Sequence, residues 1–527
     1  MTETSQAKPG TGQQQRSRNG HHPEPPPPAV EENGSDAFPC TDLGNAERLV
    51  ALHGRNLRHC AEWGQWLTWD GKRWLVGNEA VVHQWAKDTA RLMREMAQAA
   101  QKACQDALKA LDAEADGVSV REMGEQTTAE NAARRERLIM EQRIIKATLA
   151  WEQKSESNAR LNDMVALARY EKRIPVSPAE LDGNEMLLNC ENGTVDLCTG
   201  ELRPHERADL ITKICPVRYD PAAVSDTWQQ FLDRTQPDPE MQAFLQRAMG
   251  YSLTGSTAEE VLFFAFGPTL SGKSTFLKAF SRMLGDYAKT ADFEMFLSGG
   301  NRAAGAAKED VARLAGARFV TSIEVSKGAK LAEGIVKVVT GGDSITARFL
   351  YKATFEFSPT YKLWLAANDE PRASDDDAAL WRRILQVPFA ESIPESERDP
   401  GIKAALVEPE ISGPALLAWA VQGCLDWQRD GLQVPAAVRK ATANYRAGQN
   451  PLTDFLAECC VIGVECRCKN DEIWQEYQRW TRENGVRRPV GRKTFTQKMI
   501  AYGFTQEHDH NSRFWLGIGI LGPENDY

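Results

Sequence analysis

The chain has 527 residues, with 42% hydrophobic residues, 26% charged residues and a net charge of −10. At roughly 100–200 residues per domain, this length predicts three or four folded units, and the acidic balance excludes a protein that coats nucleic acid over its whole surface. The strongest apolar run, 261–266, is only six residues long, whereas a membrane-spanning helix needs about 20, so we expect no membrane partner.

The N-terminal region predicts a tail followed by a small module. Residues 1–40 contain seven of the 26 prolines and few apolar residues, so we expect a disordered tail. Residues 41–82 form a tryptophan-rich module, in which 66–69 and 72–76 flank Asp70-Gly71. This dipeptide supplies the positive φ angles of a type I′ turn, as in a two-residue β-hairpin. We expect the tryptophans in the core of this module, with base stacking as the alternative.

Residues 83–235 are expected to be mostly helical. The span 85–113 carries apolar residues at helical spacing, and no proline interrupts it before Pro175. Within the same domain, Asn192-Gly193 and Thr199-Gly200 mark the turns of a short β meander. A further helix is predicted over 228–253.

The most informative region begins at residue 261. The apolar run 261–266 predicts a strand that is buried on both faces of a parallel sheet. An amphipathic helix is predicted from Lys273 to Leu284. Between them the sequence fits G-x-x-x-x-G-K-[ST], with the residues Gly267, Pro268, Thr269, Leu270, Ser271, Gly272, Lys273, Ser274 and Thr275. A strand, this loop and a helix in that order predict a phosphate-binding loop.

Each residue type in this loop suits a nucleoside triphosphate with Mg²⁺. Glycines let backbone N–H groups surround phosphates, and the N-terminus of the helix attracts negative charge. We expect Lys273 to neutralise the β- and γ-phosphates and Ser274 to ligate Mg²⁺. The predicted cofactors are therefore ATP and Mg²⁺.

Four further residues are candidates for ATP hydrolysis. Glu324 ends a predicted strand, 317–323, where it could hold Mg²⁺ or activate water; an exposed glutamate is the alternative. Asn368 ends a third predicted strand and could contact the γ-phosphate, with a simple turn residue as the alternative. Arg382 and Arg383 follow an acidic turn, and one of them could reach the γ-phosphate of a neighbouring subunit. A surface ion pair fits the same two arginines.

Basic residues in two places are candidates for DNA contact. Residues 345–358 predict a hairpin that could meet a threaded single strand, and a purely structural hairpin is the alternative; the candidates here are Lys337, Arg348 and Lys352. Helices over 471–484 and 492–502, with a hairpin after them, predict a winged-helix module. Its candidates are Arg487, Arg488, Arg492 and Lys493, with protein docking as the alternative.

Four cysteines near the start of this module do not predict a zinc site. Cys459, Cys460, Cys466 and Cys468 have the spacing C-C-x₅-C-x-C, and no histidine lies close to them in the sequence. Structural zinc sites ordinarily use C-x₂₋₄-C pairs. We therefore expect these thiols to remain without zinc.

The chain resembles the superfamily 3 helicases, specifically the helicase portion of the phage and plasmid primase–helicase family, which is related to poxvirus primase–helicases. The resemblance covers roughly residues 41–520. It rests on the stretches TDLGNAERLV, LLNCENGTVDLCTGELRPH, GYSLTGS, GPTLSGKST, LAGARFVTSIE, VKVVTGGDSITAR, LAANDEPR and LWRRILQVPF. It implies a hexameric ring that hydrolyses ATP and unwinds forked DNA while it moves on a single strand.

This sequence departs from the family in two respects. Glu324 stands alone where an acidic pair is usual, which weakens its assignment as a ligand of Mg²⁺. Only the predicted tail stands ahead of residue 41, whereas many members carry a primase domain there, so primase activity is not supported.

The predicted architecture is an α/β P-loop, AAA+-like ATPase core at 236–440, with an α-helical N-terminal collar at 83–235 and a winged-helix module at 445–527. The predicted function is an ATP-dependent DNA helicase of a phage, prophage or plasmid. It would act on single-stranded and forked DNA in the cytoplasm of a bacterial host, with a primase or another replication protein as a partner. The alternatives are a nucleotide-gated origin-binding ATPase and a helicase loader that does not unwind DNA processively.

Overall fold

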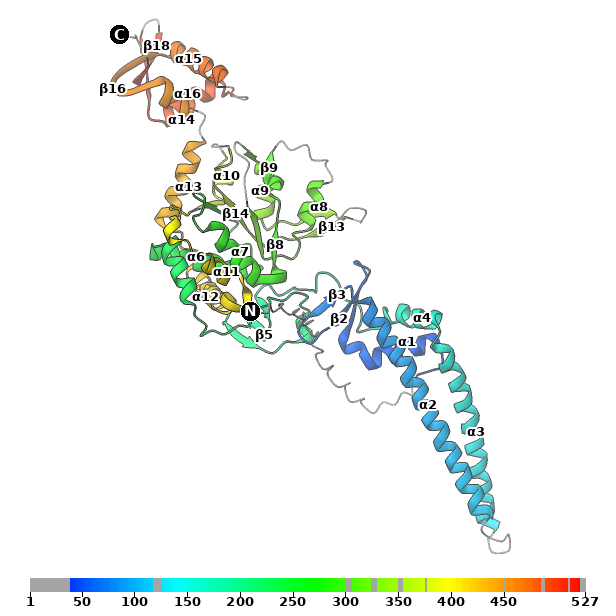
Figure 1. Ribbon diagram of the computed structural model, residues 1–527. Helices are drawn as coiled ribbons and strands as arrows, with labels where there is room; N and C mark the ends of the chain where they lie inside the picture. The colour runs from blue at the N-terminus through cyan, green and yellow to red at the C-terminus, as the bar shows by residue number, and fades with distance from the viewer. Residues whose placement is uncertain are drawn as a thin grey trace, which may run out of the picture. The chain divides into compact units, whose positions relative to one another are not determined.

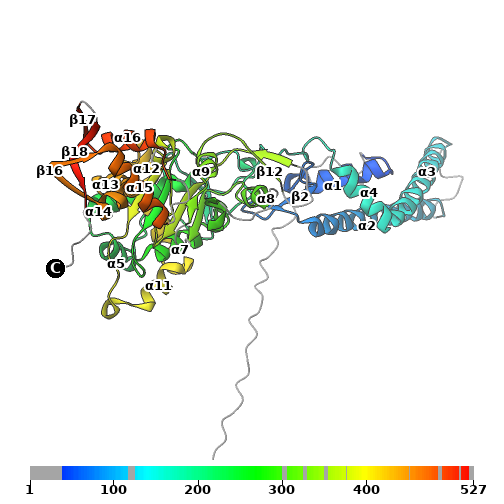
Figure 2. The ribbon, with the colours of Figure 1, turned by 90° about the horizontal axis from the view of Figure 1, so that it is seen from above.

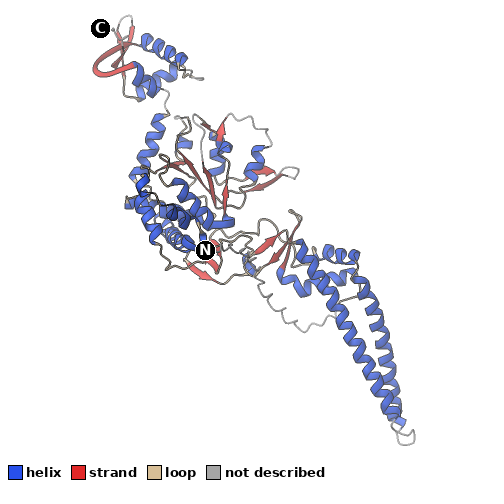
Figure 3. Cartoon of the chain, viewed as in Figure 1, coloured by secondary structure: helices blue, strands red, loops and turns tan. Residues whose placement is uncertain are grey.

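The computed structural model describes most of the chain (Figures 1 and 3). The described residues are 38–116, 125–298, 306–323, 329–348, 354–374, 377–449, 452–484, 489–509 and 512–521. Nearly all of the predicted tail thus lies outside them. Within these ranges, no helix is both long and apolar enough to cross a membrane.

The chain divides into two compact units. Unit 1 comprises Met1–Leu57 and Ala80–Pro175, and unit 2 comprises Arg58–Glu79 and Val176–Tyr527. The tryptophan-rich segment 41–82 is therefore shared between the units, and the predicted helical domain 83–235 is divided near residue 175. These boundaries differ from those that the sequence predicts because the β-hairpin near residue 70 packs with segments more than 100 residues further along the chain.

Unit 1 is helical, as predicted. Its elements are α1 (Asp42–His53), the short 3₁₀ helix η2 (Gly54–Asn56), α2 (Glu79–Asp116), α3 (Glu125–Ser155) and α4 (Asn158–Ala168). The helices α2 and α3 run antiparallel along each other in both views (Figures 1 and 2). An ion pair Arg135–Asp112 joins them at 3.2 Å, and Arg94 of α2 forms another, at 3.0 Å, with Glu156, the residue after α3.

The tryptophan-rich hairpin of unit 2 is present, but its turn differs from the predicted one. The sheet β1-β2-β3 is formed by Leu57–Cys60, Gln65–Trp69 and Trp74–Val76. Trp69 pairs with Trp74, and of the Asp-Gly dipeptide only Gly71 has a positive φ. The Asp70 carboxylate instead accepts hydrogen bonds from the backbone N–H groups of Lys72 and Arg73, at 2.7 and 2.8 Å, so a side chain stabilises the turn. Trp66 and Trp74 are buried, as the core interpretation predicts.

The predicted β meander is confirmed. It consists of β4 (Leu187–Cys190), β5 (Gly193–Asp196) and β6 (Glu201–Arg203), which pair in that order. The short 3₁₀ helix η3 (Arg207–Asp209) follows.

A five-stranded parallel sheet is the centre of unit 2, as the α/β prediction requires. Its spatial order is β15-β7-β14-β10-β8, and every neighbouring pair is parallel. The strands in chain order are β7 (Leu262–Phe266), β8 (Ala288–Thr290), β10 (Phe319–Ile323), β14 (Lys362–Ala367) and β15 (Ile384–Pro388). Phe263 and Ala265 face one hydrophobic core, whereas Leu262 and Phe264 face another. Burial of alternate residues on both faces explains why this strand is continuously apolar.

Helices and 3₁₀ turns cover both faces of the sheet. The core on one face contains residues of α5 (Asp226–Thr235), α6 (Pro239–Leu253), α7 (Lys273–Leu284), α11 (Pro400–Val407) and α12 (Pro409–Asp430). The core on the other face contains residues of η5 (Phe293–Phe296), α9 (Glu333–Thr340), α10 (Ala378–Trp381) and α13 (Ala436–Gly448). Local sequence sets the helix starts: the Asp238 side chain caps α6, whose first residue is Pro239.

Smaller elements complete this part of unit 2. They are η4 (Gly285–Tyr287), α8 (Ala306–Ala312), η6 (Glu395–Glu397), the pair β9 (Leu297–Ser298) and β11 (Lys330–Leu331), and the pair β12 (Ile345–Arg348) and β13 (Thr354–Phe357). The last pair confirms the hairpin that the sequence predicts over 345–358, although 349–353 lie outside the described residues.

The C-terminal segment has its own core. It contains α14 (Leu452–Cys459), β16 (Cys460–Lys469), α15 (Asn470–Glu483), α16 (Arg492–Ala501), β17 (Thr505–Asp509) and β18 (Ser512–Ile520), with the sheet order β16-β18-β17. Phe455, Tyr477, Phe495 and Trp515 are central to its core. The two helices and the hairpin lie where the sequence predicts them, whereas α14 and β16 are additional. No group of three or more metal-ligating side chains comes together among the described residues.

Two glycines allow α6 and α12 to approach closely. A Cβ atom on Gly250 would lie 2.0 Å from the Cys424 backbone nitrogen, and one on Gly423 would lie 2.0 Å from the Gln246 carbonyl oxygen. Backbone atoms cannot move aside as a flexible side chain can, so these positions admit no side chain without separating the helices.

We expect Gly250→Ala to destabilise unit 2 by about 1–3 kcal/mol, the usual cost of overpacking a core. Thermal unfolding followed by circular dichroism should show a lower midpoint. Gly448→Ala is the matched control, because Gly448 is also helical but has no atom within 4 Å of the added Cβ. Equal midpoints for the two variants would contradict the close approach.

Candidate nucleotide-binding site

The loop between β7 and α7 depends on two glycines with positive φ. Gly267 has φ +155°, and a Cβ there would lie 2.0 Å from the Phe389 carbonyl oxygen. Gly272 has φ +92°, and a Cβ there would lie 2.6 Å from the Thr235 Cγ2 atom. Leu270 also has a positive φ, +63°, which costs energy for a residue with a side chain. The two glycines of the sequence pattern therefore allow the loop to adopt backbone angles that residues with a side chain disfavour.

The segment that follows β15 holds this loop in place. The Phe389 N–H donates to the Phe266 carbonyl at 2.7 Å, and the Ile393 N–H donates to the Leu270 carbonyl at 3.0 Å. The Ser392 hydroxyl donates to the Thr269 carbonyl at 2.7 Å. These bonds use carbonyl groups of the loop, so they do not compete with an anion for its N–H groups.

Lys273 lies inside the loop and is only 5% exposed. Its Nζ atom is 2.7 Å from each of the Gly267 and Pro268 carbonyl oxygens, 3.1 Å from Ser271 Oγ and 3.0 Å from Asn368 Oδ1. All four contacting oxygens are uncharged. Burial lowers the pKa of this ammonium below its usual value. The arrangement is a buried cation that an anion such as phosphate would stabilise.

Asn368 reaches Lys273 because its strand lies directly beside the strand of the loop. The pairing Ala367↔Phe266 places the residues after both strand ends at the same edge of the sheet. The strand that precedes Glu324 lies one position further away, beyond β14. Glu324 itself lies outside the described residues.

The remaining candidates for holding a nucleotide lie at the first turn of α7. Ser274 is exposed and Thr275 is half-buried, and both belong to this helix. Unpaired N–H groups and the helix dipole favour negative charge at such an end. Pro268, Thr269 and Leu270 form the exposed part of the loop, whereas Ser271 is buried.

Arg382 and Arg383 lie at the opposite edge of the sheet from the loop. They precede β15, whose first residue Ile384 pairs with Leu262, the first residue of β7. The Arg383 side chain is 12% exposed and contacts Glu260 at 2.9 Å. The Arg382 side chain is 70% exposed and lies 3.7 Å from the same carboxylate. The structure thus separates a buried arginine from an exposed one, which the sequence leaves open.

The predicted DNA-binding residues fall into three groups. Lys337 forms an ion pair with Asp377 and keeps the pKa of that carboxyl below its usual value. Arg492 forms an ion pair with Asp471. Arg348 on β12 and Lys493 on α16 are exposed. Lys352, Arg487 and Arg488 lie outside the described residues.

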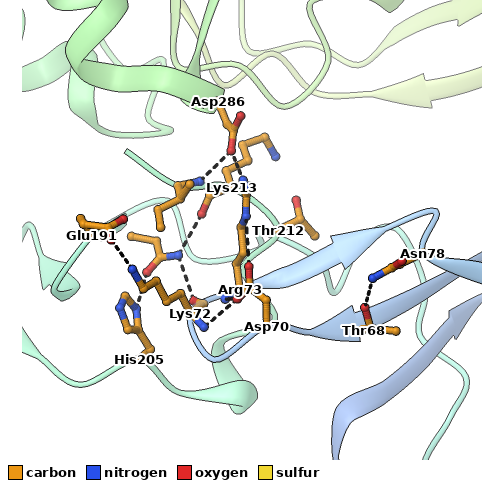
Figure 4. A network of polar contacts seen from close by, with 12 residues as sticks. Thr68, Asp70, Lys72, Arg73, Asn78, Glu191, His205, Thr212, Lys213 and Asp286 are labelled. Atoms are coloured by element: carbon orange, nitrogen blue, oxygen red, sulfur yellow. Dashed lines mark hydrogen bonds and ion pairs between the residues drawn. The ribbon is translucent and has the colours of Figure 1, made fainter. Parts of the chain in front are cut away.

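A polar network, which the sequence does not predict, ties the β2–β3 turn to the end of α7 (Figure 4). Arg73 forms an ion pair with Asp286, the second residue after α7. The Asp286 carboxylate also accepts a hydrogen bond from the Ile214 N–H at 3.1 Å. Lys72 forms an ion pair with Glu191. The helix that begins at Lys273 therefore ends in a polar connection to the hairpin.

Two family models match this chain. Residues 46–237 match the model described as D5 N terminal like, and residues 447–514 match the model described as Poxvirus D5 protein-like.

Three similar proteins come from large DNA viruses. "Putative helicase L207/L206" of Acanthamoeba polyphaga mimivirus is 28% identical over 325 residues, which are 58% of this chain and 34% of that protein. "Putative helicase 022R" of Frog virus 3 (isolate Goorha) is 28% identical over 48% of this chain and 28% of that protein. "Putative helicase 121R" of Invertebrate iridescent virus 3 is 27% identical over 57% of this chain and 35% of that protein. The chain spans about a third of the length of these relatives, and they do not support the predicted bacterial host.

Among solved structures, the C-terminal region of NrS-1 is similar to this chain. The sequences are 10% identical, the similarity covers 66% of this chain and 77% of that one, and the TM-score is 0.40.

We expect Gly272→Ala to weaken nucleotide binding by about tenfold, because a left-handed conformation costs a residue with a Cβ about 1–2 kcal/mol. The contact with Thr235 adds to this strain. Titration of a fluorescent ATP analogue measures the effect. Lys278→Ala, at an exposed position of α7 outside the loop, is the control and should bind as the wild type does. Wild-type affinity in Gly272→Ala would show that the backbone path does not matter.

Proposed function

We propose that this chain, which is related to the poxvirus D5 primase–helicases, is an ATP-dependent DNA helicase that works as a ring. It would hydrolyse ATP with Mg²⁺ and move along single-stranded DNA at forks of a phage, prophage or plasmid. The printed names of the viral relatives describe helicases, which favours the same class of activity here.

The observation that carries the proposal is the buried Lys273 ammonium with its four neutral oxygen partners. This donor set fits a nucleotide, because the negative phosphates would supply the charge that these four oxygen atoms do not. Lys273 would contact the β- and γ-phosphates, and Asn368 would contact the γ-phosphate or the water beside it. Ser274 and Glu324 would hold Mg²⁺, which neutralises charge on the phosphates when it is bound.

The position of the arginines supports assembly into a ring. Arg382 is exposed and lies at the edge of the sheet opposite its own phosphate-binding loop. A neighbouring subunit that presents its phosphate-binding loop to this edge would bring that loop and Arg382 into one site. Repetition of such a head-to-tail contact would close a ring. In this proposal, Arg382 stabilises charge on the phosphates of the neighbour.

The remaining parts of the proposal concern DNA. The β12–β13 hairpin, with Arg348 and Lys352, would contact the strand in the ring, and the helical unit 1 would be the collar. The C-terminal segment, with the order α14-β16-α15-α16-β17-β18, would be the winged-helix module, and Lys493, which is exposed on α16, would contact DNA. A primase or another replication protein would be a partner of the ring.

We expect Lys273→Ala to abolish ATP hydrolysis and unwinding, because the phosphates lose their buried cation. A strand-displacement assay on forked DNA, run beside a phosphate-release assay, measures both activities. Lys278→Ala, an exposed position of the same helix, should behave as the wild type does. ATP hydrolysis without strand displacement by the wild-type chain would favour a loader or an origin-binding ATPase.

The two arginines are expected to differ when each is replaced by alanine. Arg382→Ala should lower hydrolysis at least roughly a hundredfold and leave the unfolding midpoint unchanged, because its side chain is largely in solvent. Arg383→Ala should instead lower the midpoint, because it leaves Glu260 without its closer partner. Hydrolysis rates and thermal unfolding together test this, and an unaffected rate in Arg382→Ala would contradict its role.

A further inference from the structure

A basic cleft lies beside Arg382. Its volume is about 430 Å³, and it is formed where α10 and the start of β15 meet α13. Arg382 comes from one side, and Arg439 and Arg446 come from the other. Trp381, Ile384 and Leu385 add apolar surface. No acidic residue is among the described residues that line it, so three guanidinium groups share a cleft that favours an anion.

The helix α13 fixes the two additional arginines on one face. Arg439 and Arg446 are seven residues apart, and Thr442 lies between them, so all three lie on the same side of the helix. Tyr445 anchors the helix: it is buried and donates a hydrogen bond to the Pro371 carbonyl at 2.5 Å. The Thr442 hydroxyl accepts a hydrogen bond from the Gln386 N–H of β15 at 2.9 Å. The cleft is thus built on packed elements.

The contacts of Arg382 and Arg439 leave positive charge in the cleft. Arg439 donates to the Val434 carbonyl at 2.5 Å, which satisfies a donor but cancels no charge. Arg382 lies 3.7 Å from the Glu260 carboxylate, which is shared with the more closely bound Arg383. An exposed ion pair of this kind contributes little, so a multiply charged anion would compete for Arg382 effectively.

The cleft cannot serve the phosphate-binding loop of its own chain. The loop follows the carboxyl end of β7, whereas the cleft lies at the amino end of β15, and these strands are parallel and adjacent. At about 3.3 Å per residue, five residues separate the two edges by roughly 13 Å. This distance exceeds the reach of an arginine side chain. The anion must come from outside the chain.

We propose that the cleft receives the triphosphate of a nucleotide that the loop of a second copy of this chain holds, and that Arg439 and Arg446 bind it together with Arg382. This inference rests on the proposed ring, and it adds two phosphate-binding residues on a helix far from the loop in sequence. Thr442 would offer its hydroxyl to the same phosphates.

The first experiment replaces Arg439 and Arg446 together by alanine. We expect ATP hydrolysis by the assembled protein to fall by more than about tenfold, whereas the dilute, unassembled chain should bind a fluorescent ATP analogue as the wild type does. Lys440→Ala is the control, since Lys440 is exposed on the same helix but does not line the cleft. A second variant with glutamine at both positions keeps much of each side chain and removes only its charge.

The second experiment mixes the double variant with Lys273→Ala. In a mixed ring, an intact loop of the double variant meets intact arginines of Lys273→Ala, so hydrolysis should recover above the sum of the separate activities. No recovery would overturn the inference, as would wild-type hydrolysis by the double variant or loss of ATP binding by its dilute chain.

Two further outcomes distinguish the sources of the anion. If the double variant loses affinity for single-stranded DNA but hydrolyses ATP normally, the cleft binds DNA phosphates and the inference is overturned while the proposed function stands. If the wild-type chain hydrolyses no nucleotide with Mg²⁺ and DNA, the proposed function fails, and the inference fails with it.

Discussion

The site depends on one buried cation, whose partners among the described residues are all uncharged. Lys273 is held by two backbone carbonyls, a hydroxyl and an amide oxygen, and none of these four groups offsets its desolvation with an opposite charge. Lys362 is also buried, but it lies among the Thr254, Ser256 and Thr360 carbonyls and over the Tyr251 ring. Lys273 differs because a glycine-rich loop and the start of α7 surround it, and both favour an anion. The described part of the fold therefore places the buried charge of Lys273 where phosphates can enter.

The parallel sheet determines where the second half of such a site must lie. All carboxyl ends of the strands meet at one edge, which puts Lys273 and Asn368 together. Residues at the amino ends, including Arg382, meet at the other edge. A single copy thus presents a loop at one edge and a basic cleft at the other. Both carry positive charge, so in the proposed ring a head-to-tail contact would place the phosphates of one nucleotide between the loop of one copy and the cleft of the next.

Features that depend on local sequence could be predicted. The apolar run predicted a strand buried on both faces, which is observed at 262–266. The glycine pattern after it predicted the loop, in which Gly267 and Gly272 have positive φ angles. Helical periodicity located α7, α15 and α16 within about one residue of the observed bounds. The hairpin near Asp70 was also predictable, but not its turn, because a side-chain carboxylate rather than a pair of positive φ angles stabilises it.

Features that depend on packing across long sequence distances could not be predicted. The connection from β7 to β8 passes over the positions of β14 and β10, which leaves β14 beside β7, and no local pattern encodes this. The burial of Arg383 and the exposure of Arg382 depend on Glu260, more than 120 residues earlier.

Arg73 and Asp286 are 213 residues apart and still join the hairpin to the end of α7. A backbone hydrogen bond from the Trp74 N–H to the Ile211 carbonyl, at 2.8 Å, is a further link between residues 58–79 and the rest of unit 2, from which the helices of unit 1 separate them in sequence. The β2–β3 hairpin and the end of the helix that starts at Lys273 are therefore in contact in the fold, although the two segments lie far apart in the sequence.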